Sequence, residues 1–167
     1  MLQEPAGFHD FVVVRQRALL RTACLLTNDQ HLAEDLVQAA LERVWPRWER
    51  IVESGDAYGY VRKVMVNTYA SWWRRRWNDE RPTAHLPELP VVDVYEDCDL
   101  RDAILRTLPQ LAPRQRAVLV LRFHDDLTEV ATADVLGCSV GTVKSQTAKA
   151  LSRLRALDDP RVTERDR

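Results

Sequence analysis

Hydrophobic residues recur along most of this 167-residue chain at the three- and four-residue spacing of an amphipathic helix. In the N-terminal half the pattern predicts helices over 8–26, about 30–45 and about 57–77, with a loop over 49–56. The first of these helices has apolar positions at Phe11, Val14, Ala18 and Leu25. Side chains of Thr27-Asn28-Asp29 are suited to cap the second, and Pro46 is suited to end it.

The helical pattern stops at residue 78 and returns at residue 99. Pro82, Pro87 and Pro90 are interspersed with acidic residues in this stretch, which is typical of an extended linker. Four further helical segments begin at Asp99, Pro113, Thr128 and Val140. With no strand alternation, the sequence predicts an all-α protein of two small helical bundles joined by an extended acidic, proline-containing linker. The predicted domains are 5–77 and 99–157, with the linker over 78–98.

Composition excludes several classes of protein. No apolar run is long enough to cross a membrane, and the N-terminus lacks the pattern of a signal peptide, so we expect a cytoplasmic protein without membrane insertion. Three widely spaced cysteines without a CxxC pair predict reduced thiols and no metal site. Because nucleotide-loop, hydrolase and metalloprotease motifs are absent and the four histidines are scattered, we expect neither an enzyme nor a bound cofactor.

The formal net charge of −1 conceals an uneven distribution. Basic residues predominate over 58–81 and again over 138–155, where no acidic residue occurs, whereas 82–113 is acidic. Two basic blocks separated by an acidic spacer suggest two contacts with one polyanion. Ordinary charge scatter is the alternative.

The C-terminal stretch EVATADVLGCSVGTVKSQTAKALSRLR predicts a helix-turn-helix. Gly137 would end the first helix and Ser139 would cap the second, while Val130, Ala131 and Val135 would pack the first. One side of the second helix is largely apolar, with Val143, Thr147, Ala150, Leu151 and Leu154. The other side is small, hydrogen-bonding and basic, which favours contact with the major groove over a face that merely meets water.

The helix over 57–77 carries a second face without acidic residues, which includes Lys63, Asn67, Ser71 and Arg74. Its core side would hold Val61, Val64, Met65, Thr68, Tyr69 and Trp72. All five tryptophans lie between 45 and 77, and aromatic rings beside basic groups are typical of sites that stack unpaired bases. Trp45, Trp48 and Trp72 are alternatively ordinary core residues, whereas Trp73 and Trp77 adjoin the arginines. The helix HLAEDLVQAALERVW is amphipathic and suits a partner helix.

Taken together, these segments resemble an extracytoplasmic-function sigma factor, the minimal class of bacterial RNA polymerase sigma subunit. AEDLVQAALERVW is similar to the family's polymerase-binding segment, YGYVRKVMVNTYASWWRRR to its −10 recognition and melting segment, and LPQLAPRQRAVLVLRF with LGCSVGTVKSQTAKALSRLR to its −35-reading domain. The resemblance implies a cytoplasmic, non-enzymatic transcription initiation factor. Its partners would be core RNA polymerase, through the coiled coil of the largest subunit, promoter DNA, and an anti-sigma factor.

The resemblance also implies roles for individual residues. The −35 contacts would come from Ser139, Thr142, Lys144, Ser145, Gln146, Lys149 and Arg153. Recognition and melting of the −10 element would involve Lys63, Asn67, Ser71, Trp72, Trp73, Arg74, Arg75, Arg76 and Trp77, with the loop over 49–56 receiving a flipped base. Core polymerase would be bound by Asp35, Leu36, Gln38, Leu41, Val44 and Trp45. The alternative function is a stand-alone helix-turn-helix regulator of the LuxR type, which would bind its promoter tightly without polymerase.

Overall fold

The structure, a computed structural model, describes residues 4–79 and 106–157, with the side chains of 76–79 left out of the description. The chain divides into two units, Met1–Asp93 and Val94–Arg167. Every regular element in the described ranges is helical, which confirms the predicted all-α class. Residues 80–105, which include most of the predicted linker and most of the helix expected from Asp99, lie outside the described part, while the first two residues of the predicted linker belong to the end of α4.

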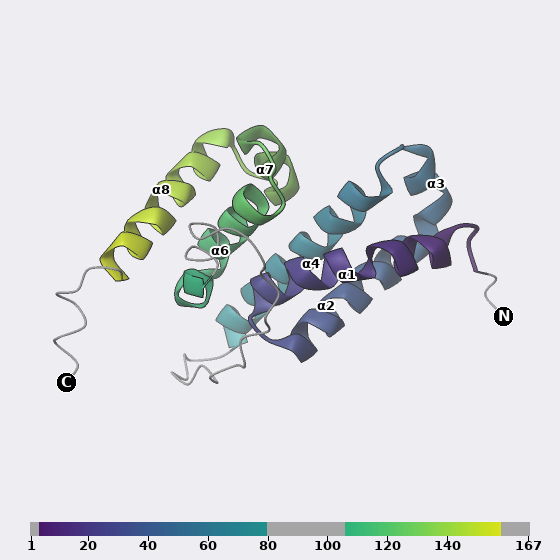
Figure 1. Cartoon of the computed structure of the whole chain (residues 1–167), viewed down its shortest axis with the longest axis horizontal. Coiled ribbons are helices and arrows are strands. Elements are labelled where there is room, and N and C mark those ends of the chain that lie inside the picture. The colour runs from purple at the N-terminus through teal and green to yellow at the C-terminus, as the bar shows by residue number, and fades with distance from the viewer. Residues whose placement is uncertain (1–3, 80–105, 158–167) are drawn as a thin grey trace. The chain divides into compact units, whose positions relative to one another are not determined.

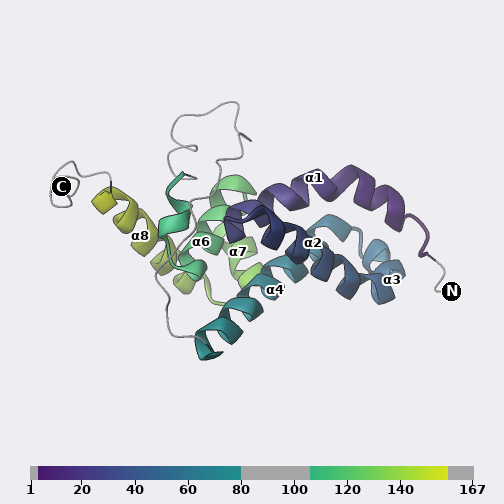
Figure 2. The same ribbon diagram turned by 90° about the horizontal axis from the view of Figure 1, so that it is seen from below.

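Three long helices form the N-terminal unit (Figures 1 and 2): α1 (Phe8–Thr27), α2 (Gln30–Val44) and α4 (Ala57–Asp79). Two short elements, the 3-10 turn η1 (Trp45–Arg47) and α3 (Trp48–Glu53), connect α2 to α4. Helices α1 and α4 both pack on α2. Their shared interior holds apolar side chains from each helix, including Leu19, Leu26, Leu36, Val44, Val61 and Met65.

The junction between α1 and α2 follows the capping prediction. Asn28 takes the left-handed conformation, with φ 52°, and its N–H donates to the carbonyl of Cys24. The Asp29 carboxylate then accepts from the N–H of Leu32 at 2.9 Å and so caps α2. Asp29 and its neighbours therefore fix where one helix stops and the next begins.

The apolar positions predicted for α1 do not mark its buried face. Val14 is 70% exposed, while Leu19, Ala23 and Leu26 are buried. The consecutive apolar residues Val12, Val13 and Val14 spread over more than half of the helix circumference, so the sequence alone does not select a face. Packing against α2 and α4 selects it.

The predicted loop over 49–56 is also corrected, because residues Trp48–Glu53 form helix α3. Trp48 and Ile51 are three residues apart, and both are buried, so burial of one helical face stabilises this short element. The Trp48 indole N–H donates to the carbonyl of Ala6 at 3.0 Å and its ring meets Phe8 edge-on. The true loop is only Ser54–Asp56, in which Gly55 has φ 85°.

The C-terminal unit consists of the turn η2 (Leu108–Gln110), α6 (Pro113–Leu119), a π-helical continuation η3 (Val120–His124), α7 (Glu129–Leu136) and α8 (Val140–Leu157). Both α6 and α7 pack on α8. Val118, Ala133 and Val143, one from each helix, form the centre of this core.

Buried Arg116 ties α6 to the turn before it. Its guanidinium donates to the carbonyls of Leu108 at 2.9 Å, Pro109 at 3.1 Å and Leu111 at 3.3 Å. A buried cation is costly unless its donors are satisfied, and here carbonyl oxygens satisfy them. The sequence pattern gave no sign that this arginine of the RQRAVLVLRF stretch would face inward.

Candidate nucleic-acid interfaces

Helices α7 and α8 form the predicted helix-turn-helix. Gly137 ends α7 in the left-handed region, at φ 62° and ψ 39°, where a glycine avoids the strain that a side chain would bring. The Cys138 N–H donates to the carbonyl of Ala133, and Ser139 Oγ accepts from the Thr142 N–H at 3.1 Å. The turn is therefore held by the residues that the sequence assigned to it.

The inner side of α8 is confirmed, whereas that of α7 is corrected. Val143 and Ala150 are fully buried, and Thr147 donates its hydroxyl to the Val143 carbonyl at 2.8 Å. On α7 the buried residues are Thr132, Ala133 and Val135, while Val130, predicted to pack, is 68% exposed. Five of the eight residues of α7 are apolar and lie all around this short helix, so periodicity does not select its inner arc.

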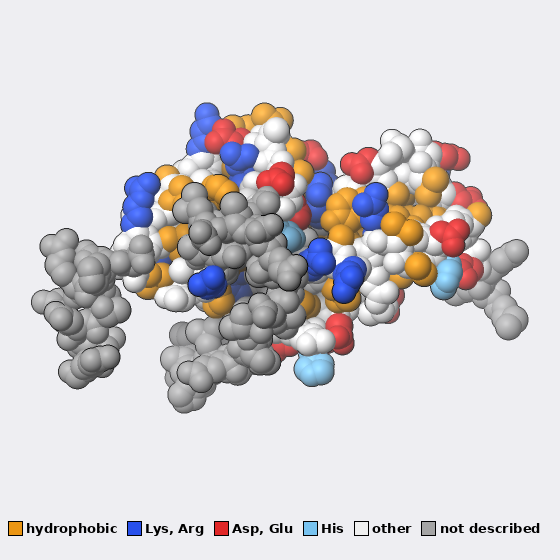
Figure 3. All heavy atoms as spheres, viewed as in Figure 1, with side chains coloured by type: hydrophobic (Ala, Val, Ile, Leu, Met, Phe, Trp, Pro, Cys, Tyr) orange, Lys and Arg blue, Asp and Glu red, His pale blue; other side chains and the backbone are white. Residues whose placement is uncertain are grey.

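The seven residues predicted to contact DNA through this unit lie on the outer side of α8 and on its cap. Lys144, Ser145, Lys149 and Arg153 are exposed, as is Ser139, while Thr142 and Gln146 are half-buried. Lys and Arg side chains follow the outer edge of α8 in Figure 3. Towards its C-terminal end the face is slightly hollowed, and Gln110 and Gln115 join Lys149 and Arg153 around the hollow. The arrangement presents amide, hydroxyl and cationic donors along one helix.

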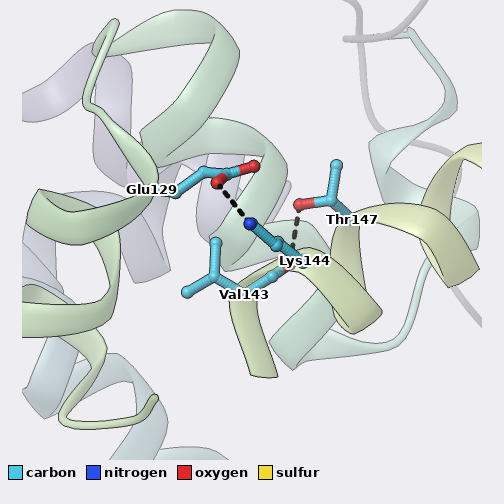
Figure 4. A network of polar contacts seen from close by, with 4 residues as sticks. All are labelled: Glu129, Val143, Lys144 and Thr147. Atoms are coloured by element: carbon cyan, nitrogen blue, oxygen red, sulfur yellow. Dashed lines mark hydrogen bonds and ion pairs between the residues drawn. The ribbon is translucent and has the colours of Figure 1, made fainter. Parts of the chain in front are cut away.

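An acidic residue that the sequence analysis missed reaches this face from α7. The Glu129 carboxylate lies 3.8 Å from the Lys144 ammonium, joining the first turn of α7 to the second turn of α8 (Figure 4). Helix α8 itself contains no acid, but folding brings in one from 15 positions earlier in the chain. No local sequence pattern could have revealed this pair.

Helix α4 positions the second predicted face. Val61, Met65, Thr68 and Tyr69 are buried as predicted, and Val66 is buried in addition. Of the residues assigned to −10 recognition and melting, Asn67, Arg74 and Arg75 are exposed, whereas Lys63, Ser71, Trp72 and Trp73 are half-buried. The side chains of Arg76 and Trp77 lie outside the described part. The structure therefore brings seven of the nine predicted residues to the surface or its margin.

The described tryptophans fall into two groups: those that pack inside the N-terminal unit and those that lie at its surface on α4. Trp48 is buried, and Trp45 is half-buried with its ring centroid 4.7 Å from that of Phe8. Both tryptophans therefore hold the start of α1 against the segment that connects α2 to α4. Trp72 was placed in the core by periodicity, but it is only half-buried. Trp73 leans edge-on against Tyr69, with ring centroids 6.2 Å apart, and keeps part of its surface free.

Two contacts that the sequence did not reveal hold α4 in place. Arg43 of α2 donates to the Thr68 hydroxyl at 2.9 Å, and that hydroxyl donates to the Val64 carbonyl at 2.8 Å. At the start of α4 the guanidinium groups of Arg15 and Arg62 lie 5.1 and 5.3 Å from the centre of the Tyr58 ring. The Arg43–Thr68 and Arg15–Tyr58 contacts fix the register of α4 against α2 and α1, whereas the Arg62–Tyr58 contact lies within α4.

The residues predicted to bind polymerase are divided between the surface and the interior of the unit. Asp35 and Gln38 are exposed on α2, and Trp45 is half-buried. Leu36, Leu41 and Val44 are buried between the helices, so the structure corrects the prediction that they offer a contact surface. They instead support the helix from which Asp35 and Gln38 project.

Neither a membrane span nor a metal site emerges in the described residues. None of the described helices is long and apolar enough to cross a bilayer. No group of three His, Cys, Asp or Glu side chains within 4–75 and 106–157 is arranged to hold a metal ion.

Comparison with known proteins decides the family. Residues 12–78 match the model of sigma-70 region 2, and residues 101–154 match that of sigma-70 region 4. The chain is 45% identical to the RNA polymerase sigma-E factor of Streptomyces coelicolor, over 91% of this chain and 86% of that protein. It is also 31% identical to the extracytoplasmic-function (ECF) RNA polymerase sigma factor SigM of Mycobacterium tuberculosis, over 84% of this chain and 71% of that protein. The chain belongs to the extracytoplasmic-function sigma factors.

Solved structures agree on the fold of this sigma factor. It resembles the sigma factor RpoE from Bartonella quintana, solved in complex with the anti-sigma factor NepR, with a TM-score of 0.67 and 22% identity. That match covers 98% of this chain and 100% of that one. CnrH, solved with the cytosolic domain of CnrY, gives a TM-score of 0.62 at 21% identity, over 91% of this chain and 87% of that one. Because region 2 and region 4 both match, the stand-alone regulator is not favoured.

Proposed function

We propose that this sigma factor binds core RNA polymerase in the cytoplasm, directs it to particular promoters and helps to open them, without catalytic activity or a cofactor of its own. The observation that carries the proposal is the pairing, in one chain, of two exposed DNA-compatible faces on rigid helices. One is the outer side of α8 and the other is the edge of α4 around Asn67, Trp73 and Arg74.

In this proposal α8 enters the major groove of the −35 element. Its exposed Ser145 and Lys149, with Gln146 beside them, match the donors that read base edges and phosphates. The Ser139 cap fixes the start of the helix, and the buried Val143 and Ala150 fix its rotation against the core. Side chains on a rigid helix are held more accurately than side chains on a loop, as sequence readout requires.

Helix α4 would act at the −10 element. Exposed Asn67 can hydrogen-bond a base edge, and Arg74 and Arg75 can hold phosphates. The free part of the Trp73 ring would stack on a base as the strands separate, an interaction worth about 1–3 kcal/mol per base. The edge contact with Tyr69 holds the Trp73 ring in place before DNA arrives.

The exposed carboxylate and amide of Asp35 and Gln38 would dock on the coiled coil of the polymerase's largest subunit.

The relative from Bartonella quintana was solved with an anti-sigma factor, and we propose a separate inhibitory protein of that class for this chain as well. Recovery of the tagged protein from its native host with a second small protein, in place of polymerase, would test this partner.

Run-off transcription tests the proposed function. Purified protein is added to core polymerase from Streptomyces coelicolor, chosen because its sigma-E factor is 45% identical, with genomic promoter fragments as templates. Core alone is the control. We expect transcripts with defined start sites only when the protein is present, and co-purification of the protein with core. Absence of both would overturn the proposal.

A further inference from the structure

We propose that Glu129 is a positioning residue that holds Lys144 away from the DNA backbone and thereby weakens the −35 contact. The inference rests on the proposed role of α8. It starts from the ion pair between Glu129 Oε2 and Lys144 Nζ at 3.8 Å, shown in Figure 4.

The position of Glu129 in the helix-turn-helix indicates how the ion pair would affect DNA binding. In a helix-turn-helix the second helix enters the major groove, while the first crosses the phosphate backbone. Glu129 is the first residue of α7, directly after the capping residue Thr128, and its side chain is 37% exposed. A carboxylate in that position would face phosphates, which repel it. The residues of this unit that are predicted to contact DNA are, by contrast, all neutral or basic.

The anchoring of both helices keeps the two side chains within reach of each other. The Thr128 hydroxyl accepts from the Ala131 N–H at 3.1 Å and fixes the start of α7. On α8, Val143 is fully buried next to Lys144, and the Thr147 hydroxyl is bonded to the Val143 carbonyl. The backbones on both sides of the pair are therefore fixed, and only the two side chains are free to change partner.

The pair is exposed enough to be exchanged. Lys144 is 63% exposed, so the ion pair adds little to folding, and water and salt compete with it. A DNA phosphate competes for the same ammonium group. Lys144 then has to leave Glu129, or the two charges reach the DNA as a neutral pair that displaces fewer counterions. In either case the carboxylate lowers the affinity of the reading unit for DNA.

The test uses three variants in the reconstituted holoenzyme: Glu129→Gln, Lys144→Met and the double variant. Equilibrium binding to a double-stranded promoter fragment, mapped in the run-off assay above, is measured over a series of KCl concentrations. Asp134→Asn is the matched control, because it removes the same charge from an exposed position on the same helix. Circular dichroism melting establishes that each variant is folded.

We expect Glu129→Gln to raise affinity about two- to fivefold at low salt and to steepen the log–log salt dependence by up to about 0.9. Lys144→Met should weaken binding and make the salt dependence shallower. In the Lys144→Met background, Glu129→Gln should give a smaller gain, because only the repulsion between the carboxylate and the phosphates is then relieved. Asp134→Asn should give less gain than Glu129→Gln when Lys144 is present.

Three results would overturn the inference while leaving the proposed function intact. One is weaker binding by Lys144→Met without any gain from Glu129→Gln. The others are an equal gain from Glu129→Gln in both backgrounds and an equal gain from Asp134→Asn, either of which would mean that the carboxylate acts through general repulsion. Lys149→Ala, which removes a second exposed cation of α8, is measured in the same way. If neither Lys144→Met nor Lys149→Ala changes binding, the proposed role of α8 fails instead.

Discussion

At the scale of single residues, burial separates two tryptophans of the N-terminal unit. Trp48 is 2% exposed and hydrogen-bonded to Ala6, whereas Trp73 is half-buried at the surface of α4. Trp48→Ala should therefore lower the free energy of unfolding by about 3–5 kcal/mol, and Trp73→Ala by clearly less. Urea unfolding followed by the fluorescence of the remaining tryptophans measures both. Equal losses would show that Trp73 belongs to the core.

Cys24 offers a second residue-scale prediction. Burial raises the pKa of its thiol, and the carboxylates of Glu34 and Asp29 raise it further. At pH 8 the folded protein should hold less thiolate at Cys24 than the unfolded chain does, so iodoacetamide should alkylate Cys24 more slowly than in urea. Because the thiol ionises more easily in the unfolded chain, raising the pH above the unfolded pKa of Cys24 lowers the free energy of unfolding. Peptide mapping by mass spectrometry measures the rates, and equal rates would contradict the prediction.

At the scale of elements, the turn between α7 and α8 depends on one backbone conformation. An added Cβ at Gly137 would meet no atom within 4 Å, so a substitution does not crowd neighbouring side chains. Its cost comes instead from the left-handed backbone conformation, with φ 62°. Gly137→Ala should cost about 1–2 kcal/mol, and Gly137→Asn should cost less, because Asn tolerates the left-handed region.

Far-UV circular dichroism follows the unfolding of these two Gly137 variants. Tryptophan fluorescence serves as an internal control, because all five tryptophans lie between 45 and 77, in the other unit. The fluorescence transition should stay unchanged in both variants. A shift of that transition, or an equal cost for Ala and Asn, would contradict the prediction.

The sequence predicts elements well where local chemistry decides them. Asp29, Gly137 and Ser139 act through their own side chains or backbone, and all three end or start helices as predicted. It fails where a distant contact decides. The inner face of α1 is chosen by α2 and α4, α3 forms because its apolar side is buried, and Arg116 turns inward because carbonyls of a preceding turn receive it. The same limit applies to the site, where Glu129 reaches Lys144 only through the fold.

At the scale of the whole molecule, near-zero net charge limits what the free protein does. A net charge of −1 supplies little non-specific attraction to DNA, although both faces are locally basic. We expect the isolated protein to bind a promoter fragment much more weakly than the holoenzyme does, as measured by fluorescence anisotropy at one fixed salt concentration. Tight binding without polymerase would instead support the stand-alone regulator.

The division of the chain into two units predicts that their contributions to initiation are separable. Lys149→Ala changes the reading face of α8, so it should impair formation of the closed complex. Trp73→Ala changes the edge of α4, so it should mainly impair opening, and a template melted in advance at the −10 element should rescue it. Because the two substitutions lie in different units, their free-energy effects on initiation should add, so the double variant should lose rate by the product of the two single factors. Permanganate footprinting separates closed from open complexes, and failure of the melted template to rescue Trp73→Ala would refute this division of labour.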